Sequence, residues 1–201
     1  MTLASGPGRH NHITKRLQAQ WWTALILCLS ILLIGFLMFA RRNPGLNNAQ
    51  WILQALSVTM YVLGLLRYGL KWNYRPDHSN LKSTLGYGTW LTIIRGALIA
   101  VLAGYLFQPW PVSKFSPDIY SWTPGLIYIA AAVLDFFDGR VARAYQHETR
   151  LGAFLDINFD ALGLLIASLV AVWYGQLPLA YLSVGCAYYI YRTGIWLRKT
   201  L

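Results

Sequence analysis

Six long apolar runs constrain this chain more than any other feature, because each has about the length that an α-helix needs to cross a bilayer. Short connections with helix-breaking residues separate them, such as Asn43-Pro44-Gly45. The runs lie at 21–40, 50–70, 88–107, 123–143, 151–174 and 177–197. This pattern predicts an all-α fold, a polytopic transmembrane helix bundle of about six spans.

The composition agrees with a membrane protein and disfavours a soluble one. Hydrophobic residues make up 56% of the chain and charged residues 12%, against about 25% charged in soluble domains. The net charge of +10 could indicate nucleic-acid binding, but the basic residues fall mostly between the apolar runs. We therefore expect contact with membrane lipids and no nucleic-acid partner.

The basic residues are also distributed unevenly between the two sides of the predicted bundle. The N-terminal tail, the second and fourth connections and the C-terminus carry more Lys and Arg than the other connections. The positive-inside rule then puts both termini and the connection at 138–151 in the cytoplasm. We expect an integral multi-pass protein of a prokaryotic cytoplasmic membrane.

Charge divides the chain into two predicted regions. Residues 1–83 form a tail, a two-span hairpin and a basic loop, whereas residues 84–201 contain nearly all of the charge inside the predicted spans.

Four of the seven acidic residues gather at the ends of two predicted spans: Asp135, Asp138, Asp156 and Asp160. The first two are three residues apart and the last two are four apart, so each pair lies on one helix face. The short connection at 145–150 makes the two helices antiparallel neighbours. The two acidic faces can then meet.

Such a cluster requires cations. Two carboxylates about 4 Å apart repel by roughly 4 kcal/mol at an effective dielectric of 20. Arginine or lysine side chains could balance them, but one or two divalent ions do so more compactly. Oxygen ligands with no patterned His or Cys nearby favour Mg²⁺ or Mn²⁺, and a pair of metal ions is a recurring device for in-line phosphoryl transfer.

Other interpretations of the charged residues stay open. Carboxylates inside a membrane also mark transporters and proton paths, and an ion-pair network with Arg140, Arg143 and Arg150 could neutralise the acids. Arg95, inside an apolar run, could extend to the membrane interface or face a cavity and bind phosphate.

Residues 135–160 match D-x2-D-G-x2-A-R-x8-G-x3-D-x3-D at every specified position, and this pattern resembles the signature of the CDP-alcohol phosphatidyltransferase family. A weaker match lies upstream, where residues 88–95 keep Leu91, Thr92 and Arg95 of the pattern P-N-x-L-T-x-x-R but replace Pro and Asn with Gly88 and Thr89. The resemblance covers about residues 84–201.

The resemblance implies a role for each matching residue. Asp135, Asp138, Asp156 and Asp160 would bind two Mg²⁺ or Mn²⁺ ions on the diphosphate of the donor, and Asp160 would also act as the general base. The residues expected to bind substrate are Gly139, Ala142, Arg143, Thr149, Gly152, Thr92 and Arg95. Missing side chains at Gly139 and Gly152 would let a nucleotide lie against the backbone.

The function implied by the resemblance is transfer of a phosphatidyl-type group from a CDP-linked donor, CDP-diacylglycerol in the first instance, to an alcohol acceptor, with release of CMP. The active site would face the cytoplasm, and a homodimer is one form that the resemblance leaves open. A small-solute or ion transporter and a non-catalytic family member are the alternatives. The family core usually has six spans, and we expect four after residue 84, so a shortened core is also open.

Overall fold

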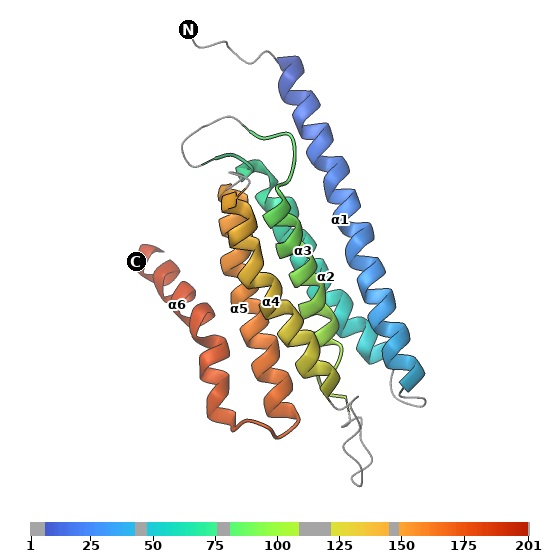
Figure 1. The fold of residues 1–201 in the computed structure, drawn as a ribbon. Helices are drawn as coiled ribbons and strands as arrows, with labels where there is room; N and C mark the ends of the chain where they lie inside the picture. The colour runs from blue at the N-terminus through green and yellow to red at the C-terminus, as the bar shows by residue number, and fades with distance from the viewer. Residues whose placement is uncertain (1–6, 43–47, 76–80, 109–121, 145–148, 201) are drawn as a thin grey trace.

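The computed structural model describes residues 7–42, 48–75, 81–108, 122–144 and 149–200, and these are predominantly helical. The six α-helices of these ranges lie at the six predicted places and form an elongated bundle (Figure 1). They are α1 (Pro7–Arg42), α2 (Asn48–Gly69), α3 (Tyr87–Ala103), α4 (Thr123–Ala144), α5 (Arg150–Trp173) and α6 (Leu182–Thr200), with short 3₁₀ helices η1 (Leu70–Trp72) and η3 (Leu179–Tyr181). The predicted all-α fold is confirmed.

Helix α1 begins well before the predicted span, which started at residue 21. The added turns are amphipathic: Leu17 is buried and Ile13 packs against the main core, while Arg16 and Gln18 are exposed. This buried stripe extends the helix on the N-terminal side of the apolar run, and apolar content alone did not reveal it.

Helix α3 lies at the centre of the bundle and contacts α1, α2, α4 and α5. Its buried residues include small ones such as Gly96, Ala97 and Ala100. A Cβ atom added at Gly96 would lie 2.9 Å from side-chain atoms of both Phe159 on α5 and Val62 on α2. Glycine therefore permits three helices to approach one another at this point.

The arrangement of α4 and α5 differs from the expected direct packing of one helix on the other. Helix α4 packs chiefly on α3, and α5 packs on α3, α6 and α2. Gly96 of α3 contributes to this arrangement, because its missing side chain lets Phe159 of α5 approach the central helix closely.

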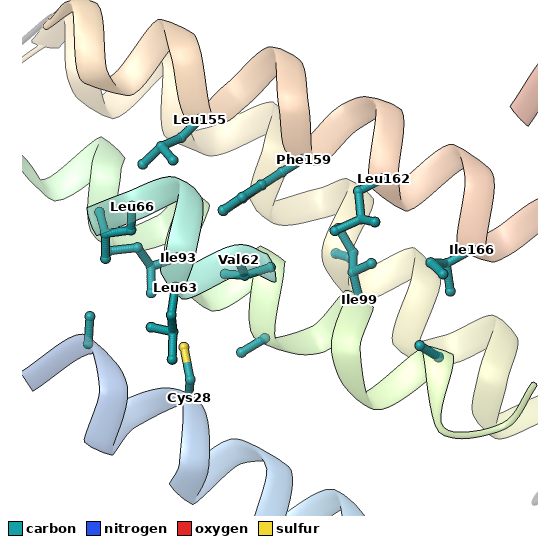
Figure 2. Packing of buried hydrophobic residues seen from close by; sticks show 14 of the residues in the cluster. Cys28, Val62, Leu63, Leu66, Ile93, Ile99, Leu155, Phe159, Leu162 and Ile166 are labelled. Atoms are coloured by element: carbon teal, nitrogen blue, oxygen red, sulfur yellow. The ribbon is translucent and has the colours of Figure 1, made fainter. Parts of the chain in front are cut away.

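The main apolar core joins five helices, α1 to α5. Figure 2 shows Cys28 of α1, the α2 residues around Leu63, the α3 residues Ile93 and Ile99, and a row of α5 residues that includes Phe159 and Leu162. Phe159 points from α5 toward α2 and α3 and is fully buried. This core fixes the rotation of α5 about its axis, and with it the direction in which the polar residues of α5 point.

The outer surface is apolar, as a membrane protein requires. Exposed side chains include Leu33, Leu37 and Met60. Exposed Ser30 and Ser57 donate their hydroxyls to carbonyls one turn earlier in their own helices, at 2.8 and 2.7 Å, so that these two polar hydrogens are paired, as an apolar environment requires.

Within the described residues, three helical segments are long and apolar enough to cross a membrane: His12–Arg41, Asn48–Trp72 and Arg150–Trp173. Tyr87–Ala103 and Thr123–Phe137 are shorter apolar helices.

Candidate active site

Three of the four predicted aspartates come together in the structure. Asp135 on α4 and Asp156 and Asp160 on α5 each offer a carboxylate oxygen, and these oxygens all lie within 4.8 Å of one another. The side chains are 44%, 43% and 54% exposed, respectively. The cluster is thus open on one side, and a ligand could reach it.

The core explains why these acids point the same way. Leu155, Phe159 and Leu162 occupy the buried side of α5, and Asp156 and Asp160 lie one helical turn apart on another face. The apolar packing of α5 therefore presents the two carboxylates together toward α4.

Arg95 binds all three carboxylates. Its Nη2 atom lies 2.8 Å from Oδ1 of Asp156, and its Nη1 atom lies 3.0 Å from Oδ1 of Asp160 and also pairs with Asp135. The Nη2 atom further donates to the backbone carbonyl of Asp156 at 3.3 Å. Arg95 is only 2% exposed. Its guanidinium group therefore lies buried beneath the acidic cluster and does not extend to the membrane interface.

The remaining charge suits a divalent cation. Three carboxylates carry −3 and Arg95 carries +1, which leaves −2 at the cluster. The ligand atoms are carboxylate oxygens, the type that Mg²⁺ and Mn²⁺ prefer. In both charge and chemistry, the residues present fit the predicted metal ion.

The alternative of an ion-pair network predicted that Arg140, Arg143 and Arg150 would neutralise the aspartates. Arg140 instead lies over the ring of Phe136, 4.0 Å from its centroid. Arg150 lies beside Tyr74, with 3.5 Å between Nη1 and the phenolic oxygen. Arg143 has its side chain outside the described residues. The cation observed at the carboxylates is Arg95, and the signal for it was its isolation within an apolar run.

Thr149 and Gly152 form the start of α5. The Thr149 hydroxyl accepts a hydrogen bond from the Gly152 backbone N–H at 3.1 Å, which caps the helix. A Cβ atom at Gly152 would lie 3.8 Å from the hydroxyl of Thr89 at the start of α3. The structure therefore places Thr149 and Gly152 at the start of α5, and Gly152 faces Thr89 at the start of α3.

For the other predicted site residues, the structure describes some side chains but not all. Thr92 is buried on α3 and donates its hydroxyl to the Gly88 carbonyl at 3.0 Å. Gly139 lies on α4, partly buried. The side chains of Asp138, Ala142 and Arg143 lie outside the described residues, although their backbones belong to α4.

A helix bundle with an apolar exterior and an open carboxylate cluster defines the general class, a membrane protein with a candidate divalent-metal site. The particular family follows from comparison with known proteins. The family model of CDP-alcohol phosphatidyltransferase matches residues 86–199, more than half of the 201 residues. This chain belongs to the CDP-alcohol phosphatidyltransferase family.

Curated bacterial proteins resemble the same part of the chain. A CDP-diacylglycerol--glycerol-3-phosphate 3-phosphatidyltransferase of Yersinia enterocolitica is 38% identical over 103 residues, which are 48% of this chain and 52% of the relative. The proteins of the same name from Sodalis glossinidius and Salmonella choleraesuis are 36% and 34% identical over 104 and 100 residues. The chain thus spans about half the length of the curated relatives it matches. No solved structure matches it.

Proposed function

We propose that this protein transfers a phosphatidyl-type group from CDP-diacylglycerol to an alcohol acceptor and releases CMP. The observation that carries the proposal is the convergence of Asp135, Asp156 and Asp160 within 4.8 Å in a chain of this family. The relatives' names include glycerol 3-phosphate, which makes it the first acceptor to test.

Asp135, Asp138, Asp156 and Asp160 would hold two Mg²⁺ or Mn²⁺ ions. When bound, such ions neutralise the charge of a diphosphate and of a departing phosphate group. Asp138 follows Asp135 by three residues in the sequence of α4.

Asp160 is assigned as the general base. Its side chain is the most exposed of the three carboxylates in the cluster, at 54%, and this makes it the most accessible to an acceptor hydroxyl. Asp160 would take the hydroxyl proton while the oxygen attacks the phosphatidyl phosphorus. One P–O bond forms, the bond from that phosphorus to the bridging diphosphate oxygen breaks, and the bridging oxygen leaves on CMP.

The substrate residues would hold the nucleotide at the ends of α4 and α5. Gly139, Ala142, Arg143, Thr149 and Gly152 are assigned to the CDP portion, and Thr92 and Arg95 to the α3 side of the site. Thr149 and Gly152 already lie beside Thr89, which supports one continuous site across α3 and α5. Arg95 would orient the carboxylates and so set their spacing for the donor.

We further propose that residues 84–201 form the catalytic core, that residues 1–83 support it, and that the site and both termini face the cytoplasm. The family match at residues 86–199 supports this division. The protein would function within the cytoplasmic membrane, as a monomer or a homodimer.

The test is CMP release by the purified full chain in neutral detergent. Labelled CDP-diacylglycerol is incubated with glycerol 3-phosphate, inositol phosphate, serine or phosphatidylglycerol, with Mn²⁺, Mg²⁺ or EDTA. We expect CMP release that depends on both a metal ion and one of the acceptors. Absence of CMP release with every acceptor and metal would contradict the proposal, and solute flux in liposomes without CMP release would favour a transporter.

A further inference from the structure

A cleft whose lining includes none of the clustered carboxylates lies between the start of α1 and the segment that precedes α3. It has a volume of about 590 Å³ and is lined by His12, Ile13, Arg16 and residues 81–84. None of these seven described residues is acidic. The proposed phosphatidyl transfer assigns no role to this cleft.

The α1 wall of the cleft is set by helical spacing. His12, Arg16 and Gln20 are each four residues apart, so they lie on one face of α1. The Gln20 side-chain oxygen accepts a hydrogen bond from the Leu85 backbone N–H at 2.7 Å. This contact ties α1 to the opposite wall and directs the face with His12 and Arg16 toward it.

The opposite wall is held by a fully buried side chain. The Nδ2 atom of Asn73 donates to the backbone carbonyls of Lys82 and Thr84, both at 3.0 Å. The Lys82 backbone N–H in turn donates to the Asn73 carbonyl at 2.8 Å. Residues 82–84 therefore have a fixed backbone, and the wall exists before any ligand arrives.

The interior of the cleft combines an apolar floor with positive charge. Leu17 and Leu85 are buried in the main core, and Ile13 and Leu81 pack against it. Arg16 and Lys82 add two formal positive charges from opposite walls. Burial, together with the nearby charge of Arg75, lowers the pKa of Lys82, as expected where cations are crowded and an anion would relieve the repulsion.

We propose that this cleft binds a phosphate group, with Arg16 and Lys82 as its charged ligands and Ser83 as a neutral hydroxyl donor. A guanidinium and an ammonium from two walls match the multiple oxygens of a phosphate. Helices α1, α3 and α5 begin at the same end of the bundle (Figure 1), and the residues that line the cleft lie near the start of α1 and just before α3. A phosphate there could belong to an anionic lipid headgroup or to a soluble molecule, and the inference does not rest on the proposed transfer reaction.

The experiment measures the binding of two ligands to the purified full chain in neutral detergent. One arm uses labelled inorganic phosphate in equilibrium dialysis, and the other uses retention of labelled phosphatidylglycerol during detergent exchange. The cleft variant is Arg16→Gln with Lys82→Gln. The matched control is Lys15→Gln with Lys71→Gln, which removes the same charge from two exposed side chains outside the cleft.

We expect the cleft variant to lose about tenfold in affinity in at least one arm, while the control variant stays within about twofold of the native protein. Loss confined to phosphatidylglycerol identifies a lipid headgroup, and loss confined to inorganic phosphate identifies a soluble ligand. Equal binding by the cleft and control variants in both arms, or no binding by the native protein, overturns the proposal.

A charge-retaining variant, Arg16→Lys with Lys82→Arg, separates charge from folding. It should keep most of the binding and the elution volume of the native protein. If it loses binding as fully as the glutamine variant while remaining folded, charge is not what the cleft recognises and the proposal fails.

Discussion

The α1–α2 hairpin and the α3–α5 bundle contain the same kinds of apolar residue but differ in their charged residues. The first 76 residues contain no Asp or Glu, whereas α4 and α5 carry four aspartates within 26 positions. The hairpin contributes cations and apolar packing, and the bundle contributes the carboxylates and Arg95. The carboxylates of the candidate site therefore all lie in the part of the chain that matches the family.

Among the tight contacts between the two regions, the one at Gly96 lies next to the candidate site. Val62 of the hairpin and Phe159 of α5 both lie against Gly96 of α3. Because Phe159 is separated from Asp160 by a single peptide bond, the packing of the hairpin bears on the position of an active-site carboxylate. The comparison thus predicts that the hairpin affects stability far more than chemistry, and that the junction affects both.

The largest effect is expected for Asp156→Asn in the bundle. Loss of one carboxylate charge from the proposed metal-binding cluster should lower the rate of CMP release by about a thousandfold or more. The matched control is Asp118→Asn, the same chemical change at an aspartate that the family signature does not include. A near-native rate for Asp156→Asn would remove the carboxylates from the mechanism.

Arg95→Gln should destabilise the metal-free protein. It leaves three carboxylates without their shared cation, and since those carboxylates are partly exposed we expect a loss of roughly 2 kcal/mol rather than the full cost of breaking a buried pair. Added Mn²⁺ should then raise the melting temperature of the variant more than that of the native protein.

The control for this prediction lies in the hairpin. Arg67→Gln removes an exposed arginine that packs over Trp21 and should change stability by no more than about 1 kcal/mol. Equal melting temperatures for Arg95→Gln and Arg67→Gln in EDTA would show that Arg95 does not hold the carboxylates together.

Gly96→Ala tests the junction between the two regions. The new methyl group would meet Phe159 and Val62 at 2.9 Å, so we expect a loss of about 1–3 kcal/mol in unfolding free energy, measured by thermal unfolding in detergent. Gly64→Ala is the matched control, because a Cβ atom there meets nothing within 4 Å. That variant should gain up to about 1 kcal/mol from helix propensity; similar losses for both would mean that the junction is not close-packed.

The smallest effect is expected for Gln20→Ala in the hairpin. It removes the hydrogen bond to the Leu85 backbone N–H and should reduce stability by about 1 kcal/mol while CMP release stays close to native. Abolished CMP release in a folded Gln20→Ala protein would show that the hairpin contributes directly to the chemistry.

The sequence predicted the helices well because apolar length and breakers act locally. All six runs became helices, and the spacing of Asp156 and Asp160 alone placed them on one face. The extension of α1 to Pro7 was not predicted, because residues such as Leu17 become a buried stripe only when other helices are present to cover them.

The contacts between distant segments could not be predicted from local spacing. Arg95 and Asp156 are 61 positions apart, and nothing in either segment specifies that α3 lies against both α4 and α5. The fixed backbone around Asn73 was also missed, because a single polar residue after a span gives no sign that its amide will be buried against Lys82 and Thr84.

The position of Arg95 has a consequence for biogenesis. It is near the middle of α3, a helix of 17 residues, where placing an arginine in a bilayer costs about 2.5–3.5 kcal/mol in the absence of a partner. The aspartates that offset this cost lie on α4 and α5, which leave the ribosome later. The first of these partners, Asp135, is available once α4 has been synthesised, and all three are available only after Asp160. Insertion of α3 is thus coupled to the helices that follow it.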